Sequence, residues 1–256
     1  MCRLFGLMAN KEVDVKFSML EAENKFKVQA GYNPDGWGVG YYDRENNPRI
    51  EKYGKCALKD ERFDKFVKEI KSKIFIAHVR LASSGSRSSD KNAHPFQYKN
   101  WLFAHNGTIN KERIRKLLAE PYNQNFTSEP IDSEVYFRFI IQNIEKNIEA
   151  IEGILAAVKM VMQDAAGANF LLSNGEELYA FKYGRPLYFL ERKPSAPLHY
   201  ISKETHALIE SKRLAGEKAV LIATEKITER ENWREFKDGD LLIVNKNLEL
   251  KLERLL

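Results

Sequence analysis

Hydrophobic residues follow two patterns that occupy different parts of the chain. Toward both ends they form short apolar runs bounded by polar or turn residues, which is typical of buried strands. These runs lie at residues 4–8, 37–42, 74–79, 101–105, 170–172, 178–181, 187–190, 199–201, 220–223 and 241–244. Near the centre, apolar residues recur every three or four positions, which indicates amphipathic helices. The pattern therefore predicts strands on either side of a helical centre.

The helical spacing predicts four helices. One covers residues 60–72, and a short one opens at 110–112 and ends near Leu118. Two longer helices follow Asp132, and each presents one apolar stripe to a core. The stripes consist of Phe137, Ile140, Ile141, Ile144, Ile148 and Ile151, and of Ile154, Leu155, Val158 and Met162. Stripes of this kind belong to the core and imply no cofactor.

A turn at residues 33–36 leads into a strand in which glycines alternate at positions 36, 38 and 40. A dinucleotide-binding fingerprint would need another glycine where Tyr41 stands, followed by a helix, so that interpretation fails. Alternating glycines instead leave one face of a strand without side chains, which lets another backbone, a core element or a ligand approach closely. The polar segment from Ser83 to Asn92 is predicted to be a mobile, lid-like loop.

No repeat or low-complexity linker divides the chain, and 43% of its 256 residues are hydrophobic. We therefore expect one domain, residues 1–256, of the α+β class, in which strands from both ends share a core with helices packed outside. The chain has no long apolar segment and no signal-peptide pattern, so we expect a cytoplasmic protein without membrane contact.

The charge and cysteine content narrow the function classes. Lysines and arginines are interleaved with glutamates despite the net charge of +5, so we expect no nucleic-acid partner. Two cysteines in different settings form neither a disulfide framework nor a metal-ligand spacing, and Cys56 is interpreted as structural. The high Lys and Glu content resembles that of heat-adapted proteins.

Cys2 directly follows the initiator methionine. If Met1 is removed, as a small second residue permits, Cys2 carries both a thiol and a free α-amine. Because an α-amine titrates near ~7.7–8.0 and a free thiol near ~8.5, the amine could take the thiol proton close to neutral pH. For an isolated cysteine, a small buried side chain at the start of a strand is the simpler interpretation.

Polar residues follow apolar strands at several further places, where rigid elements can aim side chains at a common site. Each has an ordinary structural explanation: Arg80 in a salt bridge, Asn106-Gly107 in a hairpin turn, Asp132 as a helix cap. Taken together, however, these stretches resemble the glutaminase domain of class II glutamine amidotransferases, the N-terminal-nucleophile hydrolases that begin with cysteine. The resemblance is carried, in the order of the family, by residues 2–6, 35–38, 78–80, 92–95, 103–107, 132–134, 169–172 and 223–226.

The resemblance implies a four-layer αββα sandwich, with two mainly antiparallel sheets between helix layers. It implies that Arg80 binds the α-carboxylate of glutamine, that Asp132 pairs with its α-ammonium, and that His94 belongs to the same substrate site. Cys2 would attack the side-chain amide. The resulting thioester would be hydrolysed to glutamate.

In the same comparison, the amide of Asn106 and the backbone N–H of Gly107 correspond to the oxyanion hole. No metal or organic cofactor is needed for this chemistry. A Cys-His dyad or a zinc site is the alternative suggested by His78, His94 and His105, but their spacing fits neither a zinc motif nor a helical pair.

Two positions depart from many family members, because Asn33-Pro34 and Leu81 replace a basic residue and a tryptophan. These departures point to the stand-alone branch, and they leave open the group beyond the scissile bond. We expect ammonia to be released or passed to a separate subunit. An N-terminal-nucleophile acylase acting on another amide, or a non-catalytic binding or regulatory domain of the same fold, are the competing hypotheses.

Overall fold

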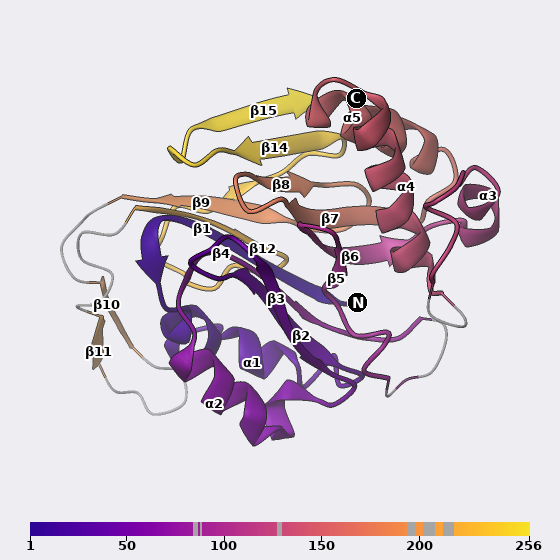
Figure 1. The fold of residues 1–256 in the computed structure, drawn as a ribbon. Helices are drawn as coiled ribbons and strands as arrows, with labels where there is room; N and C mark the ends of the chain where they lie inside the picture. The colour runs from indigo at the N-terminus through magenta and orange to yellow at the C-terminus, as the bar shows by residue number, and fades with distance from the viewer. Residues whose placement is uncertain (84–86, 88, 127–129, 194–197, 202–207, 212–217) are drawn as a thin grey trace.

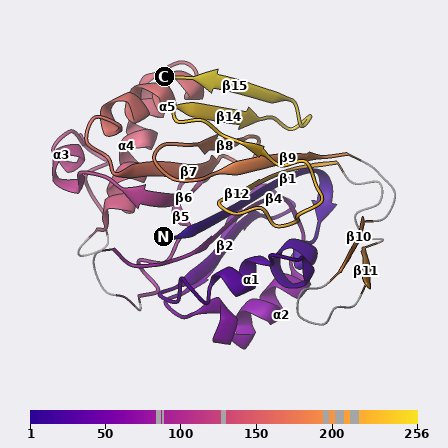
Figure 2. The same cartoon turned by 180° about the vertical axis from the view of Figure 1, so that it is seen from behind.

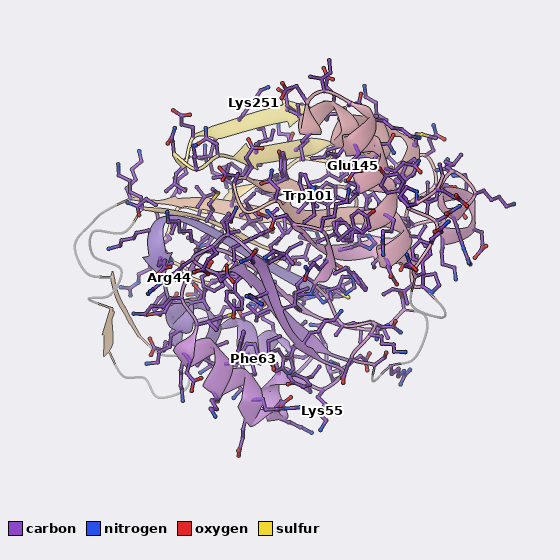
Figure 3. All side chains as sticks on the ribbon, viewed as in Figure 1. Arg44, Lys55, Phe63, Trp101, Glu145 and Lys251 are labelled. Carbon is purple, nitrogen blue, oxygen red and sulfur yellow. The ribbon has the colours of Figure 1, made fainter. Side chains whose placement is uncertain are left out.

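Two β-sheets lie face to face, with helices on both outer sides (Figure 1). The computed structural model describes residues 1–83, 87, 89–126, 130–193, 198–201, 208–211 and 218–256. The predicted αββα arrangement is confirmed, and side chains fill the space between its layers (Figure 3). In both views the N-terminus lies beside strands β5 and β6, at one end of the sandwich (Figures 1 and 2).

The first sheet has seven strands, and every neighbouring pair in it is antiparallel. Its order is β13 (Arg234–Glu235), β9 (Tyr188–Arg192), β12 (Ala219–Ala223), β1 (Arg3–Val13), β4 (Ser72–Val79), β2 (Trp37–Tyr42) and β3 (Pro48–Tyr53). The N-terminal strand β1 is therefore central, between β12 and β4.

The second sheet has six strands, again antiparallel throughout. Its order is β15 (Leu250–Arg254), β14 (Asp240–Val244), β8 (Leu178–Phe181), β7 (Gly167–Ser173), β6 (Trp101–Thr108) and β5 (Phe96–Tyr98). A separate hairpin, β10 (Leu198–Ile201) and β11 (Leu208–Ser211), lies to one side of the sandwich (Figure 1).

Each sheet has its own helix layer (Figure 2). The seven-stranded sheet is covered by η1 (Phe17–Glu21), α1 (Phe26–Gln29), η2 (Ala57–Lys59) and α2 (Glu61–Glu69). The six-stranded sheet is covered by α3 (Lys111–Arg115), α4 (Asp132–Lys146) and α5 (Ala150–Val161). The four predicted helices are confirmed as α2 to α5, but the first predicted stripe is partly wrong. Ile148 lies between α4 and α5 and is 97% exposed, and Ile151 belongs to α5 because α4 ends at Lys146. Asp60 caps α2 by accepting a hydrogen bond from the Arg62 N–H, and Phe63 of α2, labelled in Figure 3, packs edge-on against Trp37.

Strand alternation produces three cores, because successive side chains of a strand point to opposite faces. On β1, Phe5 and Leu7 pack against the helix layer, whereas Leu4 and Met8 face the second sheet. The same alternation continues along β4 and β6, where Ile76 and Ala104 belong to the core between the sheets. The alternation of two residues extends each inter-sheet face by one position, to Cys2, His78 and Asn106. All three residues therefore lie at one end of the sandwich.

The glycine face predicted for β2 is confirmed. A Cβ added at Gly38 would lie 2.1 Å from the carbonyl oxygen of His94, and one at Gly40 would lie 2.8 Å from Cγ of Pro95. The His94–Pro95 segment therefore packs directly on β2, where a side chain would exclude it.

Several boundaries differ from the sequence predictions. Strand β1 continues to Val13 rather than ending at Met8, because a register irregularity between these residues lets it bend and go on pairing with β4. Strands β3, β5, β11, β13 and β15 were not predicted. Of the predicted loop 83–92, residues 84–86 and 88 lie outside the described residues. Within the described part of the chain, none of the helices combines the length and apolarity needed to cross a membrane.

Candidate functional site

The predicted site residues lie at the ends of four elements. Cys2 precedes β1, Arg80 follows β4, Asn106 and Gly107 are near the end of β6, and Asp132 is the first residue of α4. Arg80 and Asp132 both act electrostatically on the Cys2 thiol, the first lowering and the second raising its pKa. The fold therefore brings together residues that are up to 130 positions apart in sequence.

The Cys2 thiol contacts the main chain of Leu81. Sγ accepts a hydrogen bond from the Leu81 N–H at 3.3 Å and donates to the Leu81 carbonyl at 3.4 Å. Burial is the largest influence on this thiol and raises its pKa, while the Leu81 hydrogen bond, the N-terminal ammonium and Arg80 act in the opposite direction. The resting group is accordingly a thiol that needs a base.

Arg80 is 3% exposed, and its guanidinium donates a hydrogen bond from Nη1 to the Arg87 carbonyl at 3.0 Å. Burial lowers its pKa, while the carboxylates of Asp35 and Asp132, and Cys2 when it is a thiolate, raise it. A buried guanidinium flanked by carboxylates is well suited to bind one end of a zwitterion.

Asp35 and Gly36 fix the segment that carries Arg80. The Arg80 N–H donates to the Gly36 carbonyl at 2.8 Å, and the Asp35 N–H donates to the Arg80 carbonyl at 3.0 Å. The Asp35 carboxylate also accepts from the Ala82 N–H at 2.8 Å. Leu81 is therefore held between two anchored residues, and this sets the position of its amide against the thiol.

Asn106 and Gly107 lie where β6 runs beside β7. Asn106 is 2% exposed, and among the described residues its Nδ2 has no hydrogen-bond partner. Gly107 pairs with Ala168, and a Cβ added there would lie 1.9 Å from the Gly167 carbonyl oxygen. Because buried donors are nearly always paired, the unpaired Nδ2 is unusual, as are the ring nitrogens of His78 and His94, which also lack a partner among the described residues.

Asp132 does not cap α4, because the residue at the cap position is Ile131, which has no side-chain cap hydrogen bond. The Asp132 carboxylate instead accepts a hydrogen bond at 3.2 Å from the N–H of Ile109, just beyond the end of β6. The alternative role as a helix cap is therefore wrong. Asp132 ties the start of α4 to the strand that carries Asn106.

Three histidines lie near these residues, and all are buried. The rings of His78 and His94 are 4.2 Å apart, and Nδ1 of His105 is 2.9 Å from Oγ of Ser133. Burial lowers the pKa of His78 to about 3 and also lowers those of His94 and His105, so all three are neutral at neutral pH. Within the described residues, no histidine hydrogen-bonds Cys2, and no His, Cys, Asp and Glu group has the arrangement of a metal site.

Lys52 supports the His94 segment and was missed by the sequence analysis. Its Nζ donates to the Ala93 and Pro95 carbonyls at 2.8 and 3.3 Å and lies 4.8 Å from the centre of the Phe96 ring. Burial lowers its pKa to about 8, against the opposing effect of Glu134 and Asp90. The sequence around Lys52 carries no signal for this role, because a lysine on a short edge strand is ordinarily solvated. The role of Asp35 was also missed, although it lies in a motif that was noted.

Comparison with known proteins identifies the family of this chain. The family model for class II glutamine amidotransferases matches residues 1–252, so the chain belongs to this family of amide-hydrolysing enzymes. An uncharacterized protein of Methanocaldococcus jannaschii is 33% identical over 95% of this chain and 69% of its own length. A gamma-glutamyl-hercynylcysteine sulfoxide hydrolase of Mycolicibacterium smegmatis is 27% identical over 62% of this chain and 66% of its own length.

The fold is also shared with solved structures. The glutamine phosphoribosylpyrophosphate amidotransferase of B. subtilis superimposes with a TM-score of 0.67 at 20% identity, over 99% of this chain and 49% of that one. At this identity the likeness shows the fold alone, which is that of the N-terminal-nucleophile amidotransferases.

Proposed function

We propose that this protein hydrolyses the side-chain amide of glutamine or of a related γ-glutamyl amide, with Cys2 as the nucleophile. Removal of Met1 gives Cys2 a free α-amine, which takes the thiol proton as sulfur attacks the amide carbon. The carbonyl π electrons move to oxygen, giving a tetrahedral oxyanion. A nucleophile that carries its own base fits a thiol that hydrogen-bonds no histidine among the described residues.

The observation that carries the proposal is the unpaired Nδ2 of Asn106. A buried amide donor without a partner costs free energy in the resting protein, and a negative oxygen formed during the reaction would satisfy it. The Gly107 N–H is the second donor. Packing against β7 keeps Gly107 free of a side chain, so a substrate can come close to its backbone.

Substrate selection follows from Arg80 and Asp132. The guanidinium fork binds the α-carboxylate and the aspartate binds the α-ammonium, so a free amino acid head group is required at this end. His94, packed on the glycine face of β2, lines the same region. This pairing disfavours the acylase hypothesis, because a general acylase has no need for two opposite charges.

Completion of the reaction follows the same atoms. The oxyanion collapses and the C–N bond of the substrate amide breaks. The protonated α-amine of Cys2 gives its proton to the departing nitrogen, which leaves as ammonia or an amine. Water, deprotonated by the α-amine, then attacks the thioester and releases glutamate and the thiol. Ammonia goes to solvent or to a separate acceptor subunit.

The gamma-glutamyl hydrolase among the relatives supports a hydrolytic reaction on an extended γ-glutamyl substrate. A panel of glutamine, γ-glutamyl amides and N-acylated glutamine, assayed with wild type and Cys2→Ala, tests the proposal. We expect Cys2-dependent release of ammonia or amine from at least one free γ-glutamyl amide and none from the N-acylated compound. Equal activity on the N-acylated compound would favour the acylase, and inactivity on the whole panel would favour a binding domain.

A further inference from the structure

Arg3 lies directly against the N-terminal residues. Its Nη1 donates a hydrogen bond to the Met1 carbonyl at 2.7 Å and lies 3.4 Å from the Cys2 carbonyl. Its Nη2 forms an ion pair with Glu225. The side chain of Arg3 is largely covered, with 16% of its surface exposed. A mostly covered guanidinium thus links the peptide at the nucleophile to the segment that follows β12.

That segment also holds the first residues of β1. The Leu4 N–H donates to Oγ1 of Thr224 at 2.9 Å, and the Thr224 N–H donates to the Leu4 carbonyl at 3.1 Å. Asn24 contributes a hydrogen bond to the second oxygen of Glu225 at 3.4 Å. The motif at residues 223–226, to which the proposed mechanism assigns no role, therefore anchors the end of the chain that carries Cys2.

The position of Arg3 bears on the base. In a peptide bond the carbonyl oxygen and the next nitrogen share one carbon and lie about 2.2 Å apart. Because Nη1 is 2.7 Å from the Met1 oxygen, the Arg3 cation lies within about 5 Å of the Cys2 nitrogen. Removal of Met1 takes this carbonyl away, but the ion pair with Glu225 and the contact with the Cys2 carbonyl still hold Arg3 near the nitrogen. The nitrogen then becomes an α-amine beside that positive charge.

We propose that Arg3 and Glu225 position the α-amine of Cys2 and set the pH at which it becomes a free base. This inference rests on the proposed function. A like charge at this distance disfavours the ammonium form, and only the free amine can accept the thiol proton. Arg3 is a positioning residue, since it acts on the amine and touches no substrate atom.

Four charged groups face the amine and the thiol, two from regular elements and two from segments that follow strands. Arg3 on β1 and Arg80 after β4 are cations, whereas Glu225 after β12 and Asp132 on α4 are anions. Replacing Arg3 by Gln removes the nearer cation and leaves the Glu225 carboxylate without its ion-pair partner, so both changes favour the ammonium. Replacing Glu225 by Gln leaves the cation and removes its partner, so the effect has the opposite sign.

The first experiment measures kcat/KM against pH for wild type, Arg3→Gln and Glu225→Gln. The acidic limb should move up by about one pH unit in Arg3→Gln and down by less in Glu225→Gln. Arg3→Lys keeps a cation and should retain the wild-type limb. Arg44→Gln removes an exposed arginine paired with Glu12 elsewhere on the surface and serves as the matched control, with no expected change.

The second experiment does not depend on catalysis. In a Cys2→Ala background, which still permits removal of Met1, the α-amine is titrated through its rate of acylation by an amine-reactive ester. The same opposite shifts are expected for Arg3→Gln and Glu225→Gln. Unshifted titrations, or shifts of the same sign in both variants, would overturn the inference and leave Arg3 with a purely structural role. Failure of the proposed function would give a different result. Wild-type protein would show no Cys2-dependent hydrolysis, while the titration of the α-amine would still shift in Arg3→Gln and Glu225→Gln.

Discussion

Replacing Asn106 by Ala should impair catalysis without weakening the fold. Its Nδ2 has no partner among the described residues, so the substitution removes no hydrogen bond made by that donor. Loss of one oxyanion donor raises the barrier by about 2.7–4 kcal/mol, which is a 10²–10³-fold fall in kcat. KM should stay within a few-fold of wild type, because the hydrogen bond forms only as the oxyanion develops.

Asn169 provides a matched control, because it stands opposite Asn106 in the β6–β7 register. Its side chain donates to the Arg185 and Pro186 carbonyls at 3.0 and 3.3 Å and accepts from the Tyr183 N–H at 2.8 Å. Asn169→Ala should therefore lower the free energy of unfolding by about 2–3 kcal/mol.

Urea unfolding and steady-state kinetics on both variants separate the two effects. We expect Asn106→Ala to unfold within about 1 kcal/mol of wild type, since removal of an unpaired donor costs little. A kcat within threefold of wild type would refute the assignment of Asn106 to the oxyanion hole. So would a large loss of stability that by itself accounts for the lost activity.

Three further predictions follow from the geometry. Asp35→Ala should lower kcat/KM at least about tenfold, because it releases the 80–82 segment. Asp35→Asn should retain most of the wild-type kcat/KM, because its amide oxygen can still accept from the Ala82 N–H. Equal losses in the two variants would exclude this positioning role. Arg80→Lys should raise KM for glutamine about tenfold or more with a smaller change in kcat, and an unchanged KM would argue against carboxylate binding. His78, with a folded pKa of about 3, should contribute stability that is complete above about pH 6.5 and is lost as the pH falls toward 3. Each such histidine changes the free energy of unfolding by up to about 1.4 kcal/mol per pH unit, which urea unfolding at pH 7, 6 and 5 can measure. A free energy of unfolding that does not vary with pH, or that varies equally in His78→Phe, would contradict this prediction.

Much of the fold could be predicted because its strands are buried on both faces. Runs such as 74–79 are apolar apart from His78 and buried throughout, so their strand character does not depend on recognising an exposed side. Strand β15 was missed because it is an edge strand without a fully buried residue, and its charged residues mask any apolar alternation. The bend that extends β1 to Val13 also lacks a signal, since it depends on pairing with a strand about sixty residues away.

Side-chain chemistry at the site was easier to predict than its supports. Cys2, Arg80 and Asp132 carry functional groups in recognisable stretches, and the structure places them within electrostatic range of one another. The Leu81 main chain against the thiol could not be predicted, because any residue supplies the same N–H and C=O groups. The contact of Arg3 with the N-terminal peptide likewise depends on the distant residue Glu225, which only the folded sheet brings near.

The central claim is that a processed N-terminal Cys2 is the nucleophile. Intact-protein mass spectrometry, before and after treatment with an electrophilic glutamine analogue, tests it most directly when peptide mapping locates the adduct. We predict that active protein begins at Cys2 and gains one adduct, on the Cys2 sulfur, with loss of activity in proportion. Fully active protein that retains Met1, or inactivation by an adduct on another residue, would contradict the account.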